Sequence, residues 1–375
     1  MQAKKTKHEY AYQPTGNDQA SLDAFFASIA GFPASVRETY AWIRYRSEVS
    51  FKGLTEPRWG RFLVHSTIVL LMGAFVTYQL LGDLTALKVC GLAVMAGFVS
   101  TQLATLAHAV GHNQVVRSLK KLRALSFFFG PISIGFGHTW WNDKHNKHHA
   151  NPNNPQKDPD LKVSVAALST SEDLATKNLV QRFLIRHENF TLPLFFALQA
   201  LNARLSSILF LTKRKNRKDR WSQLVGISIH IAVYIGFLWP LGRYGLLFGV
   251  IHQATFGAYN ALIFATNHKG APEGDESMGP ISKQILTSRD VSWGKMTWLI
   301  SVLMGYLDCQ GIHHLNPEAP NQNLPKMRVI AKRYCAGLGI EYVELNPFKA
   351  YLAVFSHLSK MSRWARRWEK SQKAA

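Results

Sequence analysis

Residues 62–82 read FLVHSTIVLLMGAFVTYQLLG and residues 84–107 read LTALKVCGLAVMAGFVSTQLATLA, so that one aspartate separates two long apolar runs. Each run is long enough to cross the hydrocarbon core of a bilayer as a helix, which takes about 20 residues. A second pair of apolar runs follows at 223–242 and 244–266. Buried helices of a soluble bundle are the alternative, but four such runs in closely joined pairs favour two transmembrane hairpins.

Basic residues flank these hairpins and are sparse in their turns. The chain of 375 residues carries 44 Lys+Arg and 23 Asp+Glu, a formal net charge of +21, although 47% of its residues are hydrophobic. The turns at 82–85 and 240–244 contain a single basic residue, Arg243. The flanks contain many more: Arg58, Arg61, Arg117, Lys120, Lys121, Arg123, Lys213, Arg214, Lys215, Arg217, Lys218 and Arg220. The positive-inside rule therefore predicts that both termini and the long connections are cytosolic.

The same charge has a natural partner in anionic lipid headgroups of the bilayer. The sequence has no zinc-finger, RNP-like or helix-turn-helix motif, which argues against nucleic acid as a partner. Its three cysteines lie far apart and form no CxxC pair, which fits a reducing compartment. The N-terminus has charge but no apolar core, so we expect no cleavable signal peptide.

Three further apolar stretches are predicted to be interfacial or packed cytosolic helices. Residues 124–137 and 296–307 are too short to span a bilayer, and residues 190–211 are interrupted by Asn202 and Arg204. We therefore expect an all-α integral membrane protein with four transmembrane helices in two hairpins and a cytosolic helical cap. Its expected parts are a cytosolic N-terminal segment (1–57), a membrane domain (58–345) and a basic C-terminal helical tail (346–375).

Histidines are concentrated next to these runs. They occur as H-A-V-G-H at 108–112, H-N-K-H-H at 145–149, an isolated His268 directly after the fourth run, and Q-G-I-H-H at 310–314. Positions i, i+3 and i+4 share one face of a helix, so two imidazoles from one helix can reach the same ion or two adjacent ions. Neutral imidazole suits iron, copper, nickel and zinc.

If only the four long runs cross the membrane, all these histidines lie on its cytosolic side. Eight imidazoles are too many for one ion and suit a pair of metals with room for oxygen or water. The competing carboxylate-bridged di-iron bundle needs E-x-x-H pairs, and the sequence contains none. The predicted ligands are His108, His112, His145, His148, His149, His268, His313 and His314.

With these boxes the chain resembles the membrane fatty acid desaturase family, over about residues 60 to 345. The shared pattern is HxxxH, HxxHH and (H/Q)xxHH around two hairpins, with further matches in WWNDKHNKHHANPN, QKDPDL, NHKG, QILTSRDV and HHLNP. Gln310 at the head of the last box resembles the acyl-lipid and front-end branch, which includes bacterial acyl-CoA desaturases. That branch implies a bacterial cytoplasmic membrane as the location.

The resemblance implies a di-iron centre (Fe2+/Fe3+) held by the eight histidines. It also implies O2 as co-substrate and a cis double bond introduced into an acyl-CoA or acyl-lipid. Electrons are expected from an external ferredoxin or cytochrome b5-type donor with its reductase, because no H-P-G-G haem segment or cysteine cluster is present. In some relatives an Asn one turn before the extra His holds a metal through water. Phe264 stands there, so Asn267 or Gln310 is expected to substitute.

Two departures leave the reaction outcome open. Ala109 and Ile312 stand where the family usually has Asp in the first box and Glu in the last. The alternatives are a hydroxylase, acetylenase or ketolase of the same fold, or a membrane metal-binding or transport protein. A transporter usually carries polar ligands near the middle of the bilayer. Of the histidines only His65, His230 and His252 lie within the apolar runs, and we expect them to be packing residues.

Other side chains have two interpretations each. Asp143 either orients an imidazole or caps a helix, and Asp158 and Asp160 either orient an imidazole or cap turns. Trp140 and Trp141 either line an acyl tunnel or belong to an aromatic belt. Arg289 either binds a phosphate of CoA or of a headgroup, or pairs with Asp290 or another carboxylate.

Overall fold

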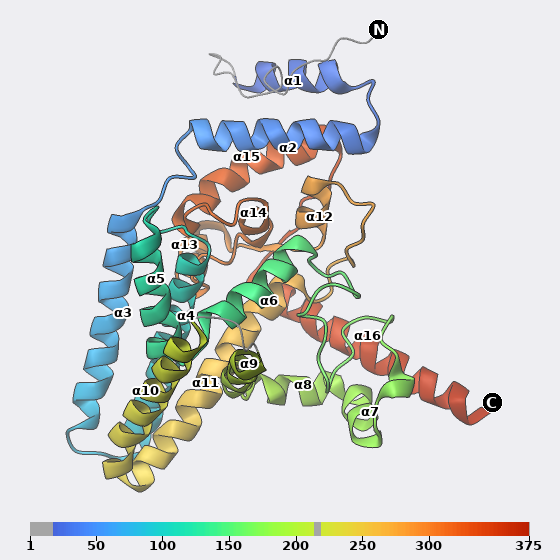
Figure 1. Ribbon diagram of the computed structural model, residues 1–375. Coiled ribbons are helices and arrows are strands. Elements are labelled where there is room, and N and C mark those ends of the chain that lie inside the picture. The colour runs from blue at the N-terminus through green and yellow to red at the C-terminus, as the bar shows by residue number, and fades with distance from the viewer. Residues whose placement is uncertain (1–17, 214–218, 375) are drawn as a thin grey trace.

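The computed structural model describes residues 18–213 and 219–374, which are mostly helical (Figure 1). The N-terminal residues 1–17 and the basic residues 214–218 of the predicted flanks lie outside the described residues. Within the described residues four helices are long and apolar enough to cross a membrane, or five if the bent pair Glu188–Phe196 and Gln199–Lys213 forms one span. The four are α3 (Trp59–Leu80), α4 (Ala86–Gly111), α10 (Arg220–Leu238) continued by η4 (Trp239–Leu241), and α11 (Arg243–His268).

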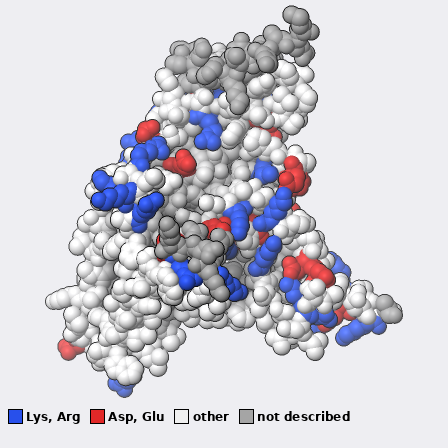
Figure 2. Space-filling model, viewed as in Figure 1, with Lys and Arg blue, Asp and Glu red and all other residues white. Residues whose placement is uncertain are grey.

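These helices correspond to the four predicted spans, with ends shifted by up to four residues. The largest shift is at the end of α4, which continues to Gly111 and so carries His108 on its last turn. Helix α4 packs against both α3 and α11 and is the most buried of the four. The outward faces carry exposed apolar side chains such as Leu71, Val233 and Leu246. In Figure 2 the surface of the long helices is nearly free of charged side chains between their upper and lower ends. That surface suits contact with lipid.

The remaining helices form a second part above and beside the four long ones (Figure 1). Its elements in chain order are α1 (Asp18–Ile29), α2 (Ala34–Phe51), α5 (Leu119–Phe127), the π-helix η2 (Phe128–Ile134), α6 (His138–Ala150), η3 (Leu174–Thr176), α7 (Leu179–Arg186), α8 (Glu188–Phe196), α9 (Gln199–Lys213), α12 (Pro280–Leu286), η5 (Gly294–Met296), α13 (Thr297–Leu303), α14 (Gln310–Leu315), η6 (Asn321–Asn323), α15 (Leu324–Leu338) and α16 (Pro347–Ala374). Two short strands, β1 (Asp290–Val291) and β2 (Glu344–Leu345), pair in parallel.

An apolar core beneath α2 holds the elements of the last histidine box. Tyr45 and Val49 of α2 pack in one cluster with Ile285 of α12, Ile312 of α14 and Tyr334 of α15. Glu38 of α2 accepts hydrogen bonds from the backbone N–H groups of Ile281 (2.7 Å) and Ser282 (2.5 Å), which begin α12. A carboxylate at a helix N-terminus satisfies free N–H groups and complements the helix dipole. Helices α12 and α14 are thereby fixed on α2.

The segment predicted as one helix at 190–211 is two helices, α8 and α9, bent by 73°. Asn202 and Arg204 do not interrupt the helix, because both lie inside α9. The bend follows Pro193, and the carbonyl groups of Phe196 and Ala197 lie against Gly257 of α11. A side chain at position 257 would meet these oxygens at 2.6–2.7 Å, so only glycine leaves room for them.

Both predicted short helices are present but begin and end earlier: α5 with η2 covers 119–134 instead of 124–137, and η5 with α13 covers 294–303 instead of 296–307. Helix η2 ends beside polar side chains of α9, α10 and α11. Arg204 donates through Nε to the Ile134 carbonyl (3.1 Å) and through Nη1 to Gln253 Oε1 (2.5 Å), and His230 Nδ1 lies 3.0 Å from the Ile132 oxygen. These contacts satisfy carbonyls that a broken helix leaves free in an apolar setting.

Candidate metal centre

The eight predicted histidines come together from four helices at one end of α4 and α11. His108 lies on the last turn of α4 and His112 caps it, while His145, His148 and His149 share one face of α6. His268 ends α11, and His313 and His314 lie on α14. All except His149, which is half-buried, are buried. The spacing within each box thus places its imidazoles on one side of a helix, as expected from helix geometry.

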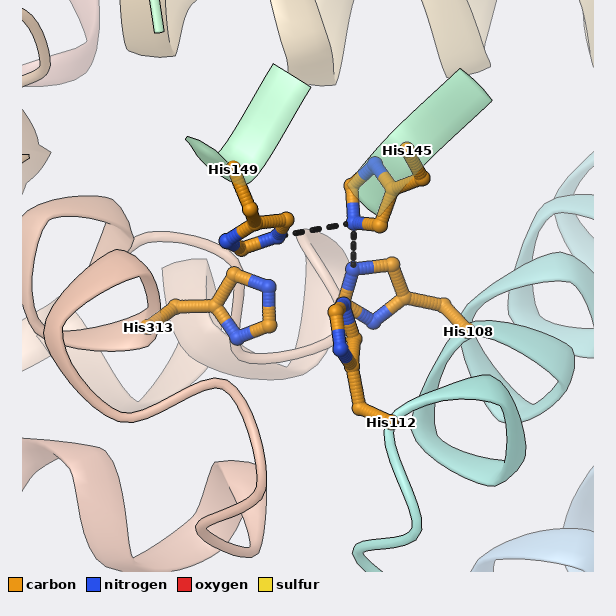
Figure 3. Close-up of side chains that lie close together, drawn as sticks. All are labelled: His108, His112, His145, His149 and His313. Carbon is orange, nitrogen blue, oxygen red and sulfur yellow. Dashed lines mark hydrogen bonds between the residues drawn. The ribbon is translucent and has the colours of Figure 1, made fainter. Parts of the chain in front are cut away.

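Five imidazoles form a first group, shown in Figure 3 with their rings pointing toward one another from α4, α6 and α14. One ring nitrogen from each lies within 4.8 Å of the others, in the set His108, His112, His145, His149 and His313. The Nε2 atom of His145 is 3.1 Å from Nε2 of His108 and 2.9 Å from Nε2 of His149. Such distances suit nitrogen atoms that ligate one ion at about 2.0–2.1 Å.

The second group consists of His148, His268 and His314, again with nitrogen atoms within 4.8 Å of one another. Its neighbour Gln310 places its amide nitrogen 3.1 Å from His268 Nε2. The two groups adjoin, because the rings of His149 and His314 stack with centroids 4.1 Å apart. The arrangement therefore offers two adjacent cation sites.

Each imidazole of the second group is held through Nδ1 by an acceptor. His148 Nδ1 lies 2.9 Å from Asp158 Oδ2, His268 Nδ1 lies 3.1 Å from the Thr287 carbonyl oxygen, and His314 Nδ1 lies 3.0 Å from Gln284 Oε1. A neutral imidazole that donates from Nδ1 presents a lone pair at Nε2. The Nε2 atoms of His148 and His268 are 3.3 Å apart. Two lone pairs at this distance repel each other unless a cation lies between them.

The first group has buried nitrogen atoms that lack partners among the described residues. They are Nδ1 of His108 and of His149, Nε2 of His112, and both ring nitrogens of His313; His314 Nε2 of the second group is likewise without a partner. Buried polar atoms without a partner cost free energy. A metal ion would satisfy the atoms that face the centre, so the residues present fit such a group.

Burial favours the neutral form of five of the imidazoles, those of His112, His145, His149, His313 and His314. It lowers the pKa of His112 to about 3, and the pKa values of His145, His149, His313 and His314 fall well below their usual range, mainly through burial and further through neighbouring imidazoles. Since only neutral imidazole can ligate a metal, the site favours the binding form at neutral pH.

One contact of the site, that of Asp158 with a box imidazole, was among the interpretations made from the sequence, and two others were not predicted. Asp158 accepts from His148 Nδ1 and also from the backbone N–H groups of Asn153 (2.8 Å) and Asp160 (2.8 Å). Gln284 binds His314, and Trp141 stacks on His145 with centroids 4.3 Å apart. The QKDPDL and QILTSRDV stretches contained the first two, but only the folded chain brings them to the histidines.

The two polar residues predicted beside the metal are adjacent. Asn267 Nδ2 donates to the Leu307 carbonyl (3.1 Å) and to Gln310 Oε1 (3.0 Å). The amide oxygen of Gln310 is thereby engaged, so its nitrogen faces His268. Gln310 thus presents an N–H donor to the second group, because its oxygen lies away from it.

Several of the alternative interpretations change. Asp143 lies inside α6 and pairs with Lys147 (2.7 Å), so the capping interpretation is wrong. The expected pair of Arg289 with Asp290 is also wrong: Arg289 donates to the Lys269 carbonyl at the end of α11 (2.6 Å), and the cation near Asp290 is Arg328 (3.7 Å).

The two departures from the family pattern differ in their surroundings. Ile312 is buried in the apolar core beneath α2. Ala109 packs in another apolar cluster, and in the described part of the chain no group replaces the missing carboxylate at His108 Nδ1.

The three histidines inside the long helices are engaged by other polar groups, as expected of packing residues. His65 lies 3.1 Å from Gln102 Oε1, and His230 is bound to the Ile132 carbonyl. His252 contacts Ser100 Oγ (2.8 Å) and the Tyr234 hydroxyl (2.7 Å).

A family model described as fatty acid desaturase matches residues 85–346. An acyl-lipid 8-desaturase of Rebecca salina is 29% identical over 248 residues, which cover 64% of this chain and 55% of that protein. The Delta(5) fatty acid desaturase fat-4 of Caenorhabditis elegans is 27% identical over 69% of this chain and 60% of its own length. Delta(8)-fatty-acid desaturase 1 of Arabidopsis thaliana is 26% identical over 80% and 71%. The chain thus spans 55% to 60% of the length of the first two relatives.

Proposed function

Since the chain belongs to the fatty acid desaturase family, we propose that it is an O2-dependent desaturase that introduces a cis double bond into a fatty acyl chain. The observation that carries this proposal is the pair of adjacent histidine groups, of which the second has Nε2 lone pairs that converge. The relatives named above are all fatty acid desaturases.

We assign two iron ions to the two groups. His108, His112, His145, His149 and His313 would hold the first, and His148, His268 and His314 the second. Bound iron would supply the oxidising power with which O2, two external electrons and two protons remove two hydrogens from adjacent methylene carbons, yielding two waters. At the reacting carbons, the role of the protein side chains would be to orient the acyl chain and to exclude water.

Gln310 and Asn267 act beside the second ion. The amide nitrogen of Gln310 faces this site, so it would donate a hydrogen bond to an oxygen ligand there, and Asn267 would hold Gln310 in that orientation. Asp143 is bound to Lys147 and would tune the charge of α6 from outside the ligand set.

The proposed topology has α3 with α4 and α10 with α11 as two transmembrane hairpins. The basic flanks support a cytosolic position for both termini, for the helical cap and for the histidine groups. The proposed parts are the N-terminal cytosolic segment (1–57), the membrane domain (58–345) and the C-terminal helical tail (346–375). The resemblance to bacterial acyl-CoA desaturases supports the bacterial cytoplasmic membrane as the location.

The substrate would be a fatty acyl-CoA or an acyl-lipid, and the electron donor a ferredoxin or a cytochrome b5-type protein with its reductase. Basic side chains on the same side as the histidine groups support an acidic donor. Purified chain with each donor, supplied with one acyl carrier at a time, distinguishes these partners by the rate of double-bond formation.

Expression in a host with analysed lipids tests the activity. A new unsaturated fatty acid is expected from the natural chain and none from His148→Ala, while His65→Ala, whose imidazole lies outside both groups, keeps it. An unchanged lipid profile with reductant and O2 available, or a hydroxylated or ketone product, would contradict the proposal. Iron analysis of the purified chain is expected to give about two irons per chain.

A further inference from the structure

Gln284 lies on α12, which reaches the centre from the side opposite the membrane helices. Its helix is fixed by the Glu38 carboxylate at its N-terminus and packs against α14, which carries His313 and His314. Gln284 and His314 also line a pocket of about 440 Å³, together with Lys283. Gln284 is therefore a half-buried side chain on a helix whose position is fixed by its contacts, next to a histidine of the second group.

Two hydrogen bonds determine how the Gln284 amide is oriented. Its Nε2 atom donates to the backbone carbonyl of His149 at 3.2 Å, and its Oε1 atom lies 3.0 Å from His314 Nδ1. A carbonyl oxygen can only accept, so the amide nitrogen must face His149 and the amide oxygen must face His314. The His149 carbonyl is in the last turn of α6, where helix carbonyls have no partner within the helix.

The tautomer of His314 follows from this orientation. An amide oxygen cannot donate, so His314 Nδ1 must carry the proton of the contact, and the neutral ring then presents its lone pair at Nε2. His314 Nε2 is buried and has no hydrogen-bond partner among the described residues, as expected of an atom reserved for a ligand. Without Gln284 the proton could occupy either nitrogen, and the protonated Nε2 would block the site.

We propose that Gln284 is a positioning residue that spans both groups. It fixes His314 as an Nε2 ligand of the second ion, and it ties the ring to the end of α6, on which His149 serves the first ion and His148 the second. This inference rests on the proposed metal centre. Partners of this kind commonly change metal affinity by about 10–100-fold when they are removed.

The test compares three variants of the full chain purified in detergent. Gln284→Met keeps a side chain of similar length and removes both hydrogen bonds, whereas Gln284→Glu keeps an acceptor for His314 Nδ1. Lys283→Met is the matched control, because Lys283 lines the same pocket from the same helix but forms no hydrogen bond to a histidine among the described residues. The readouts are iron per chain during titration with a chelator, the absorption spectrum of the Co(II)-loaded chain, and circular dichroism.

Gln284→Met is expected to lose one of two metals at chelator concentrations about 10–100-fold lower than the natural chain does, with altered Co(II) bands and unchanged helix content. Gln284→Glu is expected to restore retention in large part, and Lys283→Met to match the natural chain. Natural affinity and spectrum in Gln284→Met, or equal losses in Gln284→Met and Gln284→Glu, would overturn the role of Gln284 alone. A natural chain that binds no metal would overturn the proposed function with it.

Discussion

The Nε2 atoms of His148 and His268 lie 3.3 Å apart, although each imidazole is bound through Nδ1 to an oxygen acceptor. In the neutral rings both facing atoms are then lone-pair donors. Acceptors from two different segments hold the rings in this unfavourable arrangement. Asp158 binds His148, and the Thr287 carbonyl binds His268. The second histidine group is thus preformed for a cation.

Removal of one of these rings is expected to abolish the second site. His268→Ala should leave about one metal per chain, since two imidazoles remain in that group while the first group keeps all five of its own. Metal analysis by mass spectrometry checks this, with His252→Ala on the same helix as the control. An unchanged metal content in His268→Ala would mean that the second group holds no ion.

Gly111 leaves room for Trp141, which stacks on His145. A Cβ atom at position 111 would lie 2.3 Å from the Trp141 ring. Gly111→Ala is therefore expected to displace Trp141, to lower the free energy of unfolding by about 1–3 kcal/mol, and to weaken metal retention. Gly91→Ala on the same helix, where a Cβ would meet nothing within 4 Å, is the control. Tryptophan fluorescence and thermal unfolding measure both, and equal behaviour of the two variants would contradict the packing argument.

Arg204 donates to the Ile134 carbonyl at the end of η2, just before α6, and to the Gln253 side chain of α11. Arg204→Leu would leave the Ile134 and Gln253 oxygens without this donor, at an expected cost of about 1–3 kcal/mol in unfolding free energy. Asn202→Leu, at an exposed position of the same helix, should cost less. Thermal unfolding in detergent compares the two; an Arg204→Leu chain as stable as the natural one would show that these contacts contribute little.

Glu188 predicts a pH dependence of stability. The side chain is buried and accepts from the Ala167 N–H group (2.7 Å), and burial raises its pKa to about 8. Because the folded pKa is above the unfolded value, this group favours the folded state most below pH 4.5 and loses that contribution as the pH rises through about 8. Glu188→Gln, which stays neutral, should melt higher than the natural chain above about pH 8 and close to it at or below about pH 4.5. A difference that does not change with pH would contradict this explanation.

The spans and the histidine boxes could be predicted from the sequence because both are local. A helix that crosses a bilayer needs a certain length of apolar residues, and HNKHH places three rings on one face of α6 whatever surrounds it. The apolar run predicted as the second span ends at residue 107, whereas α4 continues to Gly111, because apolarity ends before the helix does.

Asp158, ten residues after His148, was one of the carboxylates expected to orient an imidazole. The other partners of the histidines could not be predicted, because they depend on contacts distant in sequence. Gln284 is 30 residues from His314 and meets it only when α12 packs on α14. Arg289 was expected to pair with its neighbour Asp290, yet the fold offers it the end of α11 and gives Asp290 a contact with Arg328. Similarly, the bend between α8 and α9 depends on Gly257 of α11, which admits two backbone oxygens.

The most direct test of the central claim is the mass of the product formed by the purified, iron-loaded chain from a saturated acyl substrate, with O2 and a reduced donor. The account predicts a fatty acyl product that has lost two hydrogens and gained no oxygen, and no such product from His148→Ala. A product that has gained an oxygen atom, or unchanged substrate in the presence of two bound irons and reductant, would contradict it.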